Sequence, residues 1–277
     1  MKVRIKFQKY GAMKFIGHLD VMRYFQKAFR RANVDNEYSK GFSPHQIMSF
    51  AAPLGVGLTS DAEYLDASLL SCEAPEVMIE KINGVLTEGF RVIDFRILKE
   101  PEVNQKIIHA MALVSSADYL VSLKDGYSIS ETIQSQEDFI KAFEGFMEQA
   151  EIIITKKTKK SEQAVDIKPM ISLVAFSQED YQDKLSKVLH ETVKVPDYFE
   201  KNPESKADLY DKGIKVFLQV DTGSVANLKP ELVMEAFFEY LGLAYQPFAF
   251  QVHRLELYTR LDGKILPLDL YSDIQYS

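Results

Sequence analysis

The sequence predicts an α+β protein made of two tandem ferredoxin-like units, each a βαββαβ succession with an antiparallel sheet. Two observations predict this fold class. Segments in which apolar and polar residues alternate, as in half-buried strands, are interspersed with segments in which apolar residues recur at helical spacing. The succession occurs in the N-terminal part and again, with an inserted helix and loop, in the remainder. We therefore expect a basic N-terminal unit over residues 1–100, a linker over 101–116 and an acidic C-terminal unit over 117–277.

The N-terminal unit begins with a strand in which Val3, Ile5 and Phe7 alternate with charged residues. A helix is expected over 19–32, where apolar residues recur every three or four positions. The remaining elements are extended segments over 38–50 and 63–69, a helix that Pro75 opens and Gly89 closes, and a strand over 91–98. Their order is that of a ferredoxin-like unit.

The C-terminal unit contains the same kinds of segment with additions. Strands are expected over 118–123, 151–156, 165–176, 214–220 and 250–260, and helices over 136–150, 180–193 and 230–241. Asp262 and Gly263 form a tight-turn dipeptide before a last apolar run over 265–268.

Composition limits the class of protein. Of the 277 residues, 46% are hydrophobic and 26% are charged, which is typical of a folded globular protein. The longest apolar run, 47–58, is interrupted by proline and glycine and is too short to span a bilayer. The N-terminus does not resemble a signal peptide, and Cys72 is the single cysteine, so a disulfide framework is excluded. We expect a cytoplasmic protein that does not enter the membrane.

The net charge of −7 conceals an asymmetry. Residues 1–50 contain ten Lys and Arg against three Asp and Glu, a net charge of +7, so the rest of the chain carries −14. Such a division indicates that one part of the protein meets an anion. The alternative is chance segregation of charge on two solvated faces.

The expected helix over 19–32 carries a basic stripe, defined here as Arg23, Lys27, Arg30 and Arg31. Their spacing places them on one face, away from the apolar residues, where they could contact a run of phosphates. The alternative is an ordinary solvated helix face. Cations outside the helix could extend this nucleic-acid-binding surface: Lys2, Arg4, Lys6, Lys9, Lys14 and Lys40.

His18 and His45 lie beside glycine or proline in predicted loops on either side of this helix. Two imidazoles could act as general acid and base if the fold brings them together, so both are candidate catalytic residues. With Asp20 they would form an incomplete and widely spaced ligand set, and we therefore expect no metal. The alternative for each histidine is a structural hydrogen bond.

Small and polar residues near these histidines form candidate ligand loops: Gly17, Asp20, Gly41, Ser43, Gly55 and Gly57. A backbone at glycine can approach a ligand closely, although neither a P-loop nor a dinucleotide fingerprint is present, and tight turns are the alternative. Arg254 follows His253 in an otherwise apolar strand. Since neighbouring strand residues face opposite sides, one of this pair is expected to face the core and the other a ligand or the N-terminal unit.

These motifs together resemble those of the radical SAM-linked proteins, a domain family of unknown function. The resemblance covers about residues 1–70 and rests on Gly17-His-Leu-Asp20, Arg23, Phe29-Arg-Arg-Ala, Tyr38-Ser-Lys-Gly-Phe-Ser-Pro-His45, Ser49-Phe, Pro53-Leu-Gly-Val-Gly57 and Glu63-Tyr-Leu-Asp66. Asp166-Ile-Lys-Pro169 and His253-Arg254 fit the second half of the family. Gln46 departs from the pattern, because relatives often have a second proline there.

The resemblance implies a partner, because members are fused to a radical SAM enzyme or encoded beside one. A separate radical SAM protein would carry the iron–sulfur cluster and S-adenosylmethionine, and we expect no cofactor in this chain. Our first hypothesis is an accessory, substrate-binding subunit that binds RNA, such as tRNA or rRNA, for modification. The alternatives are a protein-docking module for the radical SAM partner without RNA binding, and a stand-alone, metal-independent RNA-processing or RNA-modifying enzyme that uses His18 and His45. The RNA hypothesis requires the N-terminal cations to converge on one patch flanked by both histidine loops.

Overall fold

The computed structural model describes residues 1–99, 107–157, 162–193, 205–224, 226–271 and 273. Within these ranges the chain forms a mixed α and β structure with six α-helices and a large, mostly antiparallel sheet. This confirms the α+β class. No helix in the described ranges is both long and apolar enough to cross a membrane.

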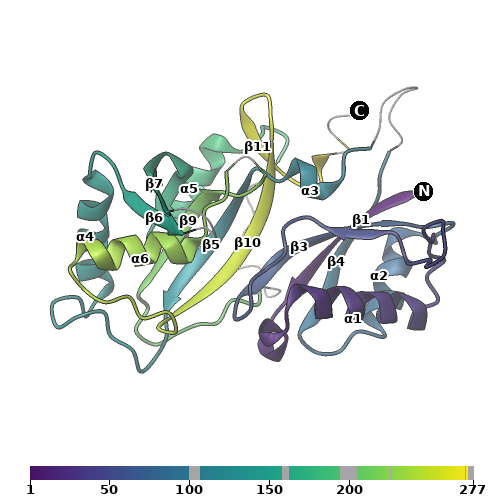
Figure 1. Cartoon of the computed structure of the whole chain (residues 1–277), viewed down its shortest axis with the longest axis horizontal. Coiled ribbons are helices and arrows are strands. Elements are labelled where there is room, and N and C mark those ends of the chain that lie inside the picture. The colour runs from purple at the N-terminus through teal and green to yellow at the C-terminus, as the bar shows by residue number, and fades with distance from the viewer. Residues whose placement is uncertain (100–106, 158–161, 194–204, 225, 272, 274–277) are drawn as a thin grey trace.

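The N-terminal half contains four strands and two helices (Figure 1). In chain order these are β1 (Lys2–Lys9), α1 (His18–Arg31), β2 (Met48–Phe50), β3 (Thr59–Ser68), α2 (Pro75–Asn83) and β4 (Phe90–Ile97). Within the expected extended segment 38–50, the structure assigns a strand only to β2. A short 3-10 helix, Gly11–Phe15, precedes α1.

The C-terminal half contains the other described elements. They are α3 (Ala110–Leu113), β5 (Ser116–Leu123), α4 (Gln136–Glu148), β6 (Ile153–Lys157), β7 (Glu162–Asp166), β8 (Ile171–Ala175), α5 (Gln178–Val188), β9 (Lys215–Asp221), α6 (Pro230–Tyr240), β10 (Phe250–Leu261) and β11 (Lys264–Pro267). Part of the expected linker, 101–106, lies outside the described residues, and α3 occupies positions that we expected to belong to it.

One sheet of nine strands passes through both halves, in the order β4-β1-β3-β10-β5-β9-β8, with β2 added to β3 and β11 added to β10. The halves join where β3 and β10 run parallel, at the pairs Thr59↔His253 and Ser60↔Arg254. The other described pairings of this sheet are antiparallel. The expectation of two sheets is therefore replaced by one continuous sheet.

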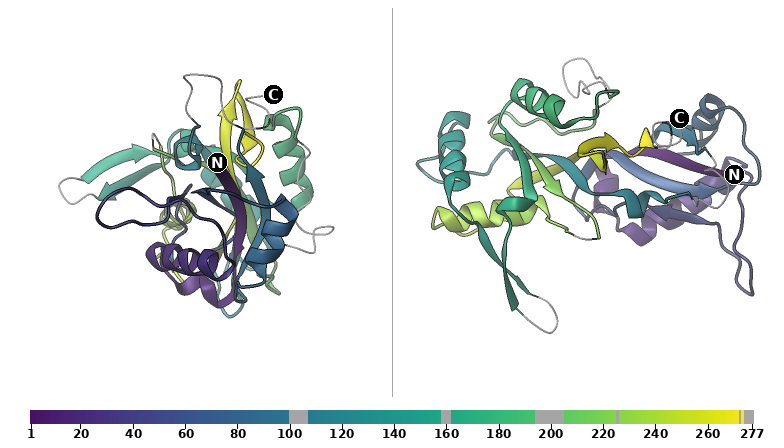
Figure 2. Two further views of the ribbon diagram at one scale, coloured as in Figure 1. Left: turned by 90° about the vertical axis from the view of Figure 1, so that its right-hand side faces the viewer. Right: turned by 90° about the horizontal axis from the view of Figure 1, so that it is seen from above.

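The predicted strand over 165–176 is wrong as a single element. Pro169 lies within a 3-10 turn, Lys168–Met170, that separates β7 from β8, because proline has no N–H to donate to a sheet. β7 pairs instead with β6 in a hairpin that projects from the main sheet (Figure 2).

Strand alternation sets the two faces of β1. Val3, Ile5 and Phe7 point toward the core formed with α1 and α2, which lie on the same side of the sheet (Figure 1). Phe25 of α1 packs its ring 4.6 Å from that of Phe7. The opposite face of β1 carries Arg4, and this face meets the C-terminal half.

Candidate functional site

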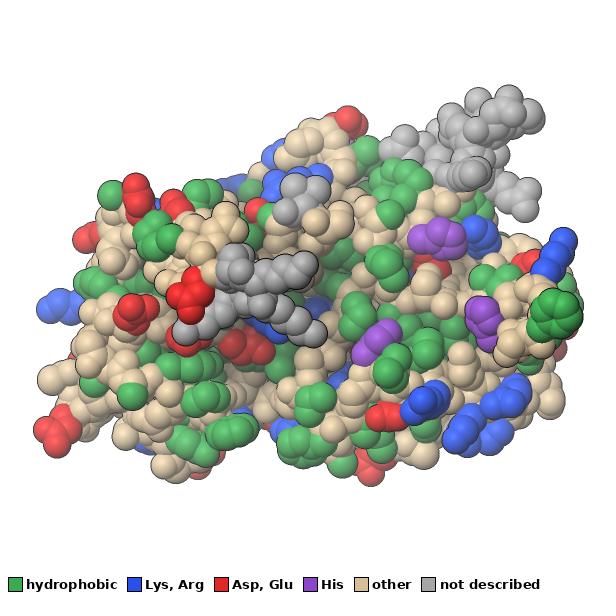
Figure 3. All heavy atoms as spheres, viewed as in Figure 1, with side chains coloured by type: hydrophobic (Ala, Val, Ile, Leu, Met, Phe, Trp, Pro, Cys, Tyr) green, Lys and Arg blue, Asp and Glu red, His purple; other side chains and the backbone are tan. Residues whose placement is uncertain are grey.

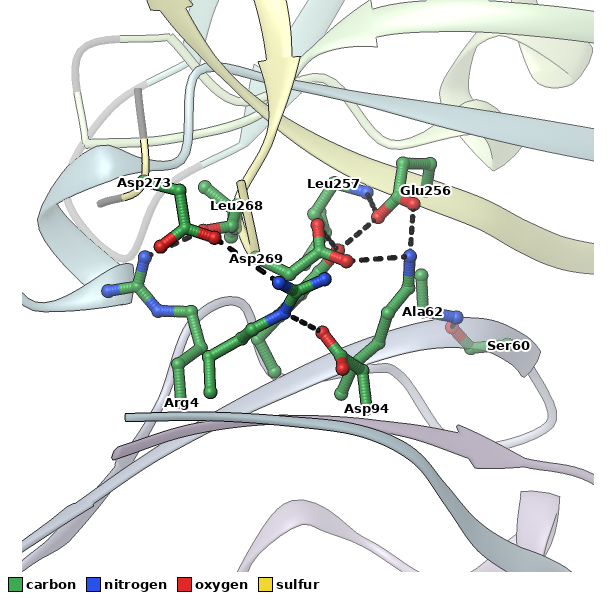
Figure 4. A network of polar contacts seen from close by, with 12 residues as sticks. Arg4, Ser60, Ala62, Asp94, Glu256, Leu257, Leu268, Asp269 and Asp273 are labelled. Carbon is green, nitrogen blue, oxygen red and sulfur yellow. Dashed lines mark hydrogen bonds and ion pairs between the residues drawn. The ribbon is translucent and has the colours of Figure 1, made fainter. Parts of the chain in front are cut away.

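The cations of β1 form ion pairs and hydrogen bonds inside the protein. The Arg4 guanidinium, 1% exposed as a residue, donates to both carboxylate oxygens of Asp66 at 2.8 and 3.0 Å and to the Leu268 carbonyl oxygen at 2.8 Å. Arg4 lies in a polar layer between the halves, where it reaches Leu268 (Figure 4). The charge of Arg4 is therefore unavailable to an external anion.

Lys6 belongs to the same layer. Its Nζ atom lies 2.5 Å from Glu256 and 3.7 Å from Asp269, and the Tyr64 hydroxyl donates to both carboxylates. Burial alone would lower the pKa of Lys6, but Asp269 and Glu256 hold it above its ordinary value. Lys6 thus stays charged while it ties the N-terminal half to the C-terminal half.

Two further lysines also turn inward. Lys9 is buried and donates to the Ile16 carbonyl oxygen at 3.1 Å, and burial lowers its pKa. Lys14 is half-buried and contacts Gln251 at 3.3 Å and Asp208 at 3.4 Å, both in the C-terminal half. The expectation that the N-terminal cations converge on one patch is therefore wrong for Arg4, Lys6 and Lys9, because the second half covers their side of the sheet.

The basic stripe lies on α1 and is exposed. Val21, Phe25 and Phe29 occupy the opposite face of the helix, where they are buried in the N-terminal core. Lys40 is exposed as well, in the loop that follows α1. All four cations of the stripe are exposed on α1: Arg23, Lys27, Arg30 and Arg31. The Arg31 guanidinium already donates to the Val85 carbonyl oxygen at 2.8 Å, but its side chain and the rest of the stripe are exposed and can meet a partner.

His18 and His45 lie in different surroundings. His18 is the first residue of α1, where its ring meets that of Phe50 edge-on at 5.1 Å, and burial lowers its pKa. His45 is exposed in a loop, and its Nδ1 atom lies 2.9 Å from Ser39 Oγ. Within the described part of the chain the two rings do not contact each other. There is also no cluster of three or more His, Cys, Asp or Glu suited to a metal among the described residues.

The predicted ligand loops serve several roles. Gly17 is the N-cap of α1, and the Asp20 carboxylate contacts Arg23 at 3.4 Å within the same helix. Gly41 and Gly57 have φ angles of +119° and +90°, which side chains disfavour. Ser43 is exposed beside Gly41. The Gly57 N–H donates to the Lys14 carbonyl oxygen at 2.7 Å, so the loop containing Gly55 and Gly57 is anchored to the segment before α1.

A groove runs between the two halves and contains two adjacent cavities. The larger, of about 540 Å³, lies between β2 and β3 on one side and α3 on the other. The smaller, of about 370 Å³, is bordered by the loop that includes Gly55 and by the start of α6. Met111 and Ser224 line both, so the cavities adjoin at these two residues. Both volumes fall in the usual range of about 300–1,000 Å³ for ligand sites.

Arg254 lines the smaller cavity, yet it is 4% exposed. Its guanidinium donates to Glu63 and to the Ala52 carbonyl oxygen, each at 2.8 Å, and to the Tyr119 hydroxyl. Burial raises the pKa of Glu63, an effect that the charge of Arg254 opposes. Arg254 therefore supports the cavity wall while it fixes β10 to β3.

His253 is buried on the other side of β10. Its Nε2 atom lies 2.9 Å from Asp61, and its Nδ1 atom lies 2.8 Å from Thr59 Oγ1. The contact with His253 lowers the pKa of Asp61 against the opposing effect of burial. Both members of the 253–254 pair are thus buried and contact β3 of the N-terminal half, whereas we expected only one of them to meet that half or a ligand.

Sequence reasoning named Lys2, Gly55 and Arg254 but missed other groove residues, among them His109, Met111 and Ser224. Lys2 Nζ lies 3.2 Å from His109 Nε2, and both line the larger cavity. His109 had no informative neighbours in sequence, and Met111 and Ser224 are far apart along the chain. Of Lys2 and His109, only the lysine had a signal, since it alternates with apolar residues in β1 and so belongs to the face opposite the helices.

The groove adjoins the basic stripe. Gln46 donates to the carbonyl oxygen of Gln26, in the middle of α1, at 3.3 Å, and Ile47 and Met48 then line the larger cavity. On the face shown in Figure 3, a hydrophobic hollow lies among histidine side chains, with lysine and arginine side chains gathered below it. Cations and groove thus form one candidate surface.

Fold and groove together define an α+β protein with a mostly antiparallel sheet and an inter-half groove beside an exposed basic helix. The chain belongs to the family described as "uncharacterized protein conserved in bacteria" (DUF2344), which it matches over residues 2–230. The matched range includes α1, the loops that follow it, and α3. No curated protein matches the chain.

Proposed function

We propose that this chain is an accessory subunit that binds RNA and presents it to a radical SAM enzyme. The observation that carries the RNA part is the exposed basic stripe on α1, Arg23, Lys27, Arg30 and Arg31, next to a groove. The enzyme part rests on the resemblance of residues 1–70 to radical SAM-linked proteins. The partner would carry the iron–sulfur cluster and S-adenosylmethionine.

The stripe suits a run of phosphates for a physical reason. Its side chains are exposed, so contact with phosphate costs little desolvation, and each contact releases counterions from the nucleic acid. The Arg23 contact with Asp20 joins two side chains that are 67% and 64% exposed, and such pairs contribute little stability. A phosphate can therefore replace Asp20 as the partner of Arg23.

We also propose that the two halves are tandem ferredoxin-like units whose sheets have joined. The N-terminal strands lie in the order β4-β1-β3-β2, and the main C-terminal strands lie in the order β10-β5-β9-β8. In both sets the first strand lies between the last and the third, which is the ferredoxin-like order. The domain limits 1–100 and 117–277 follow from this proposal.

The test of RNA binding is a salt titration with bulk tRNA and with rRNA fragments, read by fluorescence anisotropy. Arg30→Glu with Arg31→Glu should weaken binding and reduce the dependence of log affinity on log salt by roughly 0.7–0.9 for each lost phosphate contact. Lys141→Glu with Lys187→Glu is the matched control, because both lysines are exposed and lie on α4 and α5 of the C-terminal half. Unchanged binding by the α1 variant, or no binding even at low salt, would refute the RNA proposal.

The protein-docking alternative is supported by exposed apolar side chains near α1. Phe15 is 67% exposed and Leu19 is 60% exposed. In this alternative the basic stripe docks on an acidic surface of the radical SAM partner. The same α1 variant should then abolish co-purification with that partner, while wild-type protein shows no RNA binding.

The stand-alone enzyme stays a prediction. It requires His18 and His45 to act on one substrate, whereas they lie in different elements. Incubation of RNA with the chain, followed by mass spectrometry, tests it. A mass change or cleavage that disappears in His18→Gln with His45→Gln would support this alternative over an accessory role.

A further inference from the structure

The larger cavity of the groove has a cationic end. Lys2 and His109 line it, and Lys2 Nζ lies 3.2 Å from His109 Nε2. An ammonium group can only donate, so Nε2 accepts and the imidazole hydrogen lies on Nδ1, 3.9 Å from Asp66. The charge of Asp66 is already balanced by Arg4, which holds both its oxygens. The positive charge of Lys2 is therefore left for an external anion.

The other walls of this cavity are mostly apolar, although Ser49, Ser68, Ser224 and the Arg4-paired Asp66 also line it. Met48 and Ala67 come from the N-terminal sheet, Leu98 follows β4, and Met111 and Ala112 come from α3. Methionine side chains are flexible and polarisable, and they contact flat rings favourably. A ligand that complements the cavity thus has a flat, weakly polar body and a single anionic group.

The adjoining smaller cavity contains a hydrogen-bond acceptor that a ligand could use. The Oε2 atom of Glu231, which lines this cavity, is buried and has no hydrogen-bond partner among the described residues. A buried acceptor without a partner is costly, and a ligand N–H or O–H can satisfy it. Hydroxyl groups of a ribose or amino groups of a base supply such donors.

We propose that the groove binds an unpaired nucleotide of RNA, with its base between Met48 and Met111 in the larger cavity and its phosphate at Lys2. The neighbouring nucleotide extends toward Glu231 in the smaller cavity. This inference rests on the proposed function and names the substrate class: single-stranded or flipped-out RNA, because a stacked base in a duplex cannot enter a cavity. Phosphates further along the strand reach the basic stripe, which the Gln46–Gln26 contact places beside the groove.

Methionine methyl NMR tests the position of the base. The full chain, labelled with ¹³C at its methionine methyl groups, is titrated separately with adenosine monophosphate, uridine monophosphate and a single-stranded oligonucleotide. Met48→Leu and Met111→Leu assign the two groove resonances, which should shift on addition of each single-stranded probe. The methyl groups of Met78 and Met234 are internal controls, since these residues are 2% and 0% exposed in the cores. Unchanged Met48 and Met111 resonances with bound oligonucleotide would overturn the inference.

A blocking variant gives a second readout. Ala112 is exposed at the cavity wall, so Ala112→Trp should fold and fill the cavity. It should weaken oligonucleotide binding by about ten-fold or more, as loss of a stacked base does. Ala150→Trp is the matched control at an exposed position beyond α4, and its affinity should equal that of the wild type.

The outcomes separate this inference from the proposed function. If the α1 charge reversal abolishes RNA binding while Ala112→Trp changes neither affinity nor the methyl resonances, the groove inference is wrong and the proposed function stands. If no RNA binds but the monophosphates shift Met48 and Met111, the groove binds nucleotides and the RNA proposal fails. An RNA duplex that shifts these methyl groups as strongly as the single strand would also overturn the inference.

Discussion

The polar layer between the halves and the basic stripe on α1 use the same residue types in opposite ways. In the layer, Arg4 and Lys6 are held by carboxylates that the fold buries with them. On the stripe, Lys27 and Arg30 extend into solvent. Both sets come from the first 31 residues, and each of their cations adds one positive charge to that segment. Net charge in a sequence therefore does not distinguish a cation that holds the fold from one that can meet a ligand.

The difference has a structural cause. A helix on the outside of a sheet buries one face and leaves the other to water, so spacing alone shows which cations of α1 are exposed. A strand has two faces, and alternation says only that Arg4 and Lys6 share one of them. What covers that face depends on β10 and β11, which are more than 240 residues away in sequence.

The largest expected effect comes from removing a cation of the layer. Arg4→Met leaves the Asp66 carboxylate, 5% exposed, without its cationic partner. Loss of one member of a buried ion pair costs about 3–5 kcal/mol of unfolding free energy. Urea unfolding of the variant and the wild type measures the difference.

Arg30→Met is the matched control, since it makes the same replacement on the exposed stripe. Its unfolding free energy should lie within about 0.5 kcal/mol of the wild type. The double variant Arg4→Met with Asp66→Asn should recover part of the loss, because the unpaired charge is gone. Equal stability of Arg4→Met and Arg30→Met would contradict the distinction between the two regions.

A smaller effect on stability is expected at the buried Asp118, whose carboxylate accepts hydrogen bonds from neutral donors only. Burial raises the pKa of Asp118 to about 7, although hydrogen bonds from Tyr181, Gln219 and Tyr258 oppose this. Between the two pKa values, the folded state therefore keeps a proton on Asp118 that the unfolded chain, in which this pKa is ordinary, has released. The contribution of this proton to the free energy of unfolding is fully present below the pKa that Asp118 has in the unfolded chain. It is lost as the pH rises through about 7.

Between about pH 5 and 8 the contribution of Asp118 to the unfolding free energy should fall by about 2–3 kcal/mol. Urea unfolding at several pH values measures it, and Asp118→Asn should flatten the profile. Glu63 and Glu256, whose pKa values burial also raises, leave a residual slope of the same sign. A profile that Asp118→Asn leaves unaltered would assign the pH dependence to other groups.

The smallest effect is expected at the surface ion pair of α1. Arg23→Met removes a contact of 3.4 Å between side chains that are 67% and 64% exposed. Exposed pairs contribute about 0–1 kcal/mol, so thermal unfolding should change little. RNA affinity should nevertheless fall, because Arg23 belongs to the proposed phosphate-binding stripe. A large loss of stability would place Arg23 with the structural cations.

Much of the fold could be predicted from local pattern. The alternation of Val3, Ile5 and Phe7 identified β1 and its core face, and helical spacing identified α1 with its exposed side. The joining of the halves could not be predicted, because two residue pairs between β3 and β10 have no local signal. Pro169 did carry a signal, since proline interrupts strands, and its position marks the division between β7 and β8.

The candidate site also has one part that could be predicted from the sequence and one part that could not. The exposure of Arg23, Lys27, Arg30 and Arg31 followed from helical spacing, because one helix determines it. The groove could not be predicted, because its walls come from β2, β3, α3 and the start of α6. His109 illustrates this: it is the N-cap of α3, and its chemical neighbours, Lys2 and Asp66, come from β1 and β3.

The junction between β3 and β10 is short, yet it admits a single alignment. His253 and Arg254 pair with consecutive residues of β3, and each sends its side chain to a different carboxylate of that strand, Asp61 or Glu63. A slip of one position would exchange the two faces and break both side-chain contacts together. The alignment of the two halves, and with it the spacing of the groove walls, therefore depends on these two side-chain contacts.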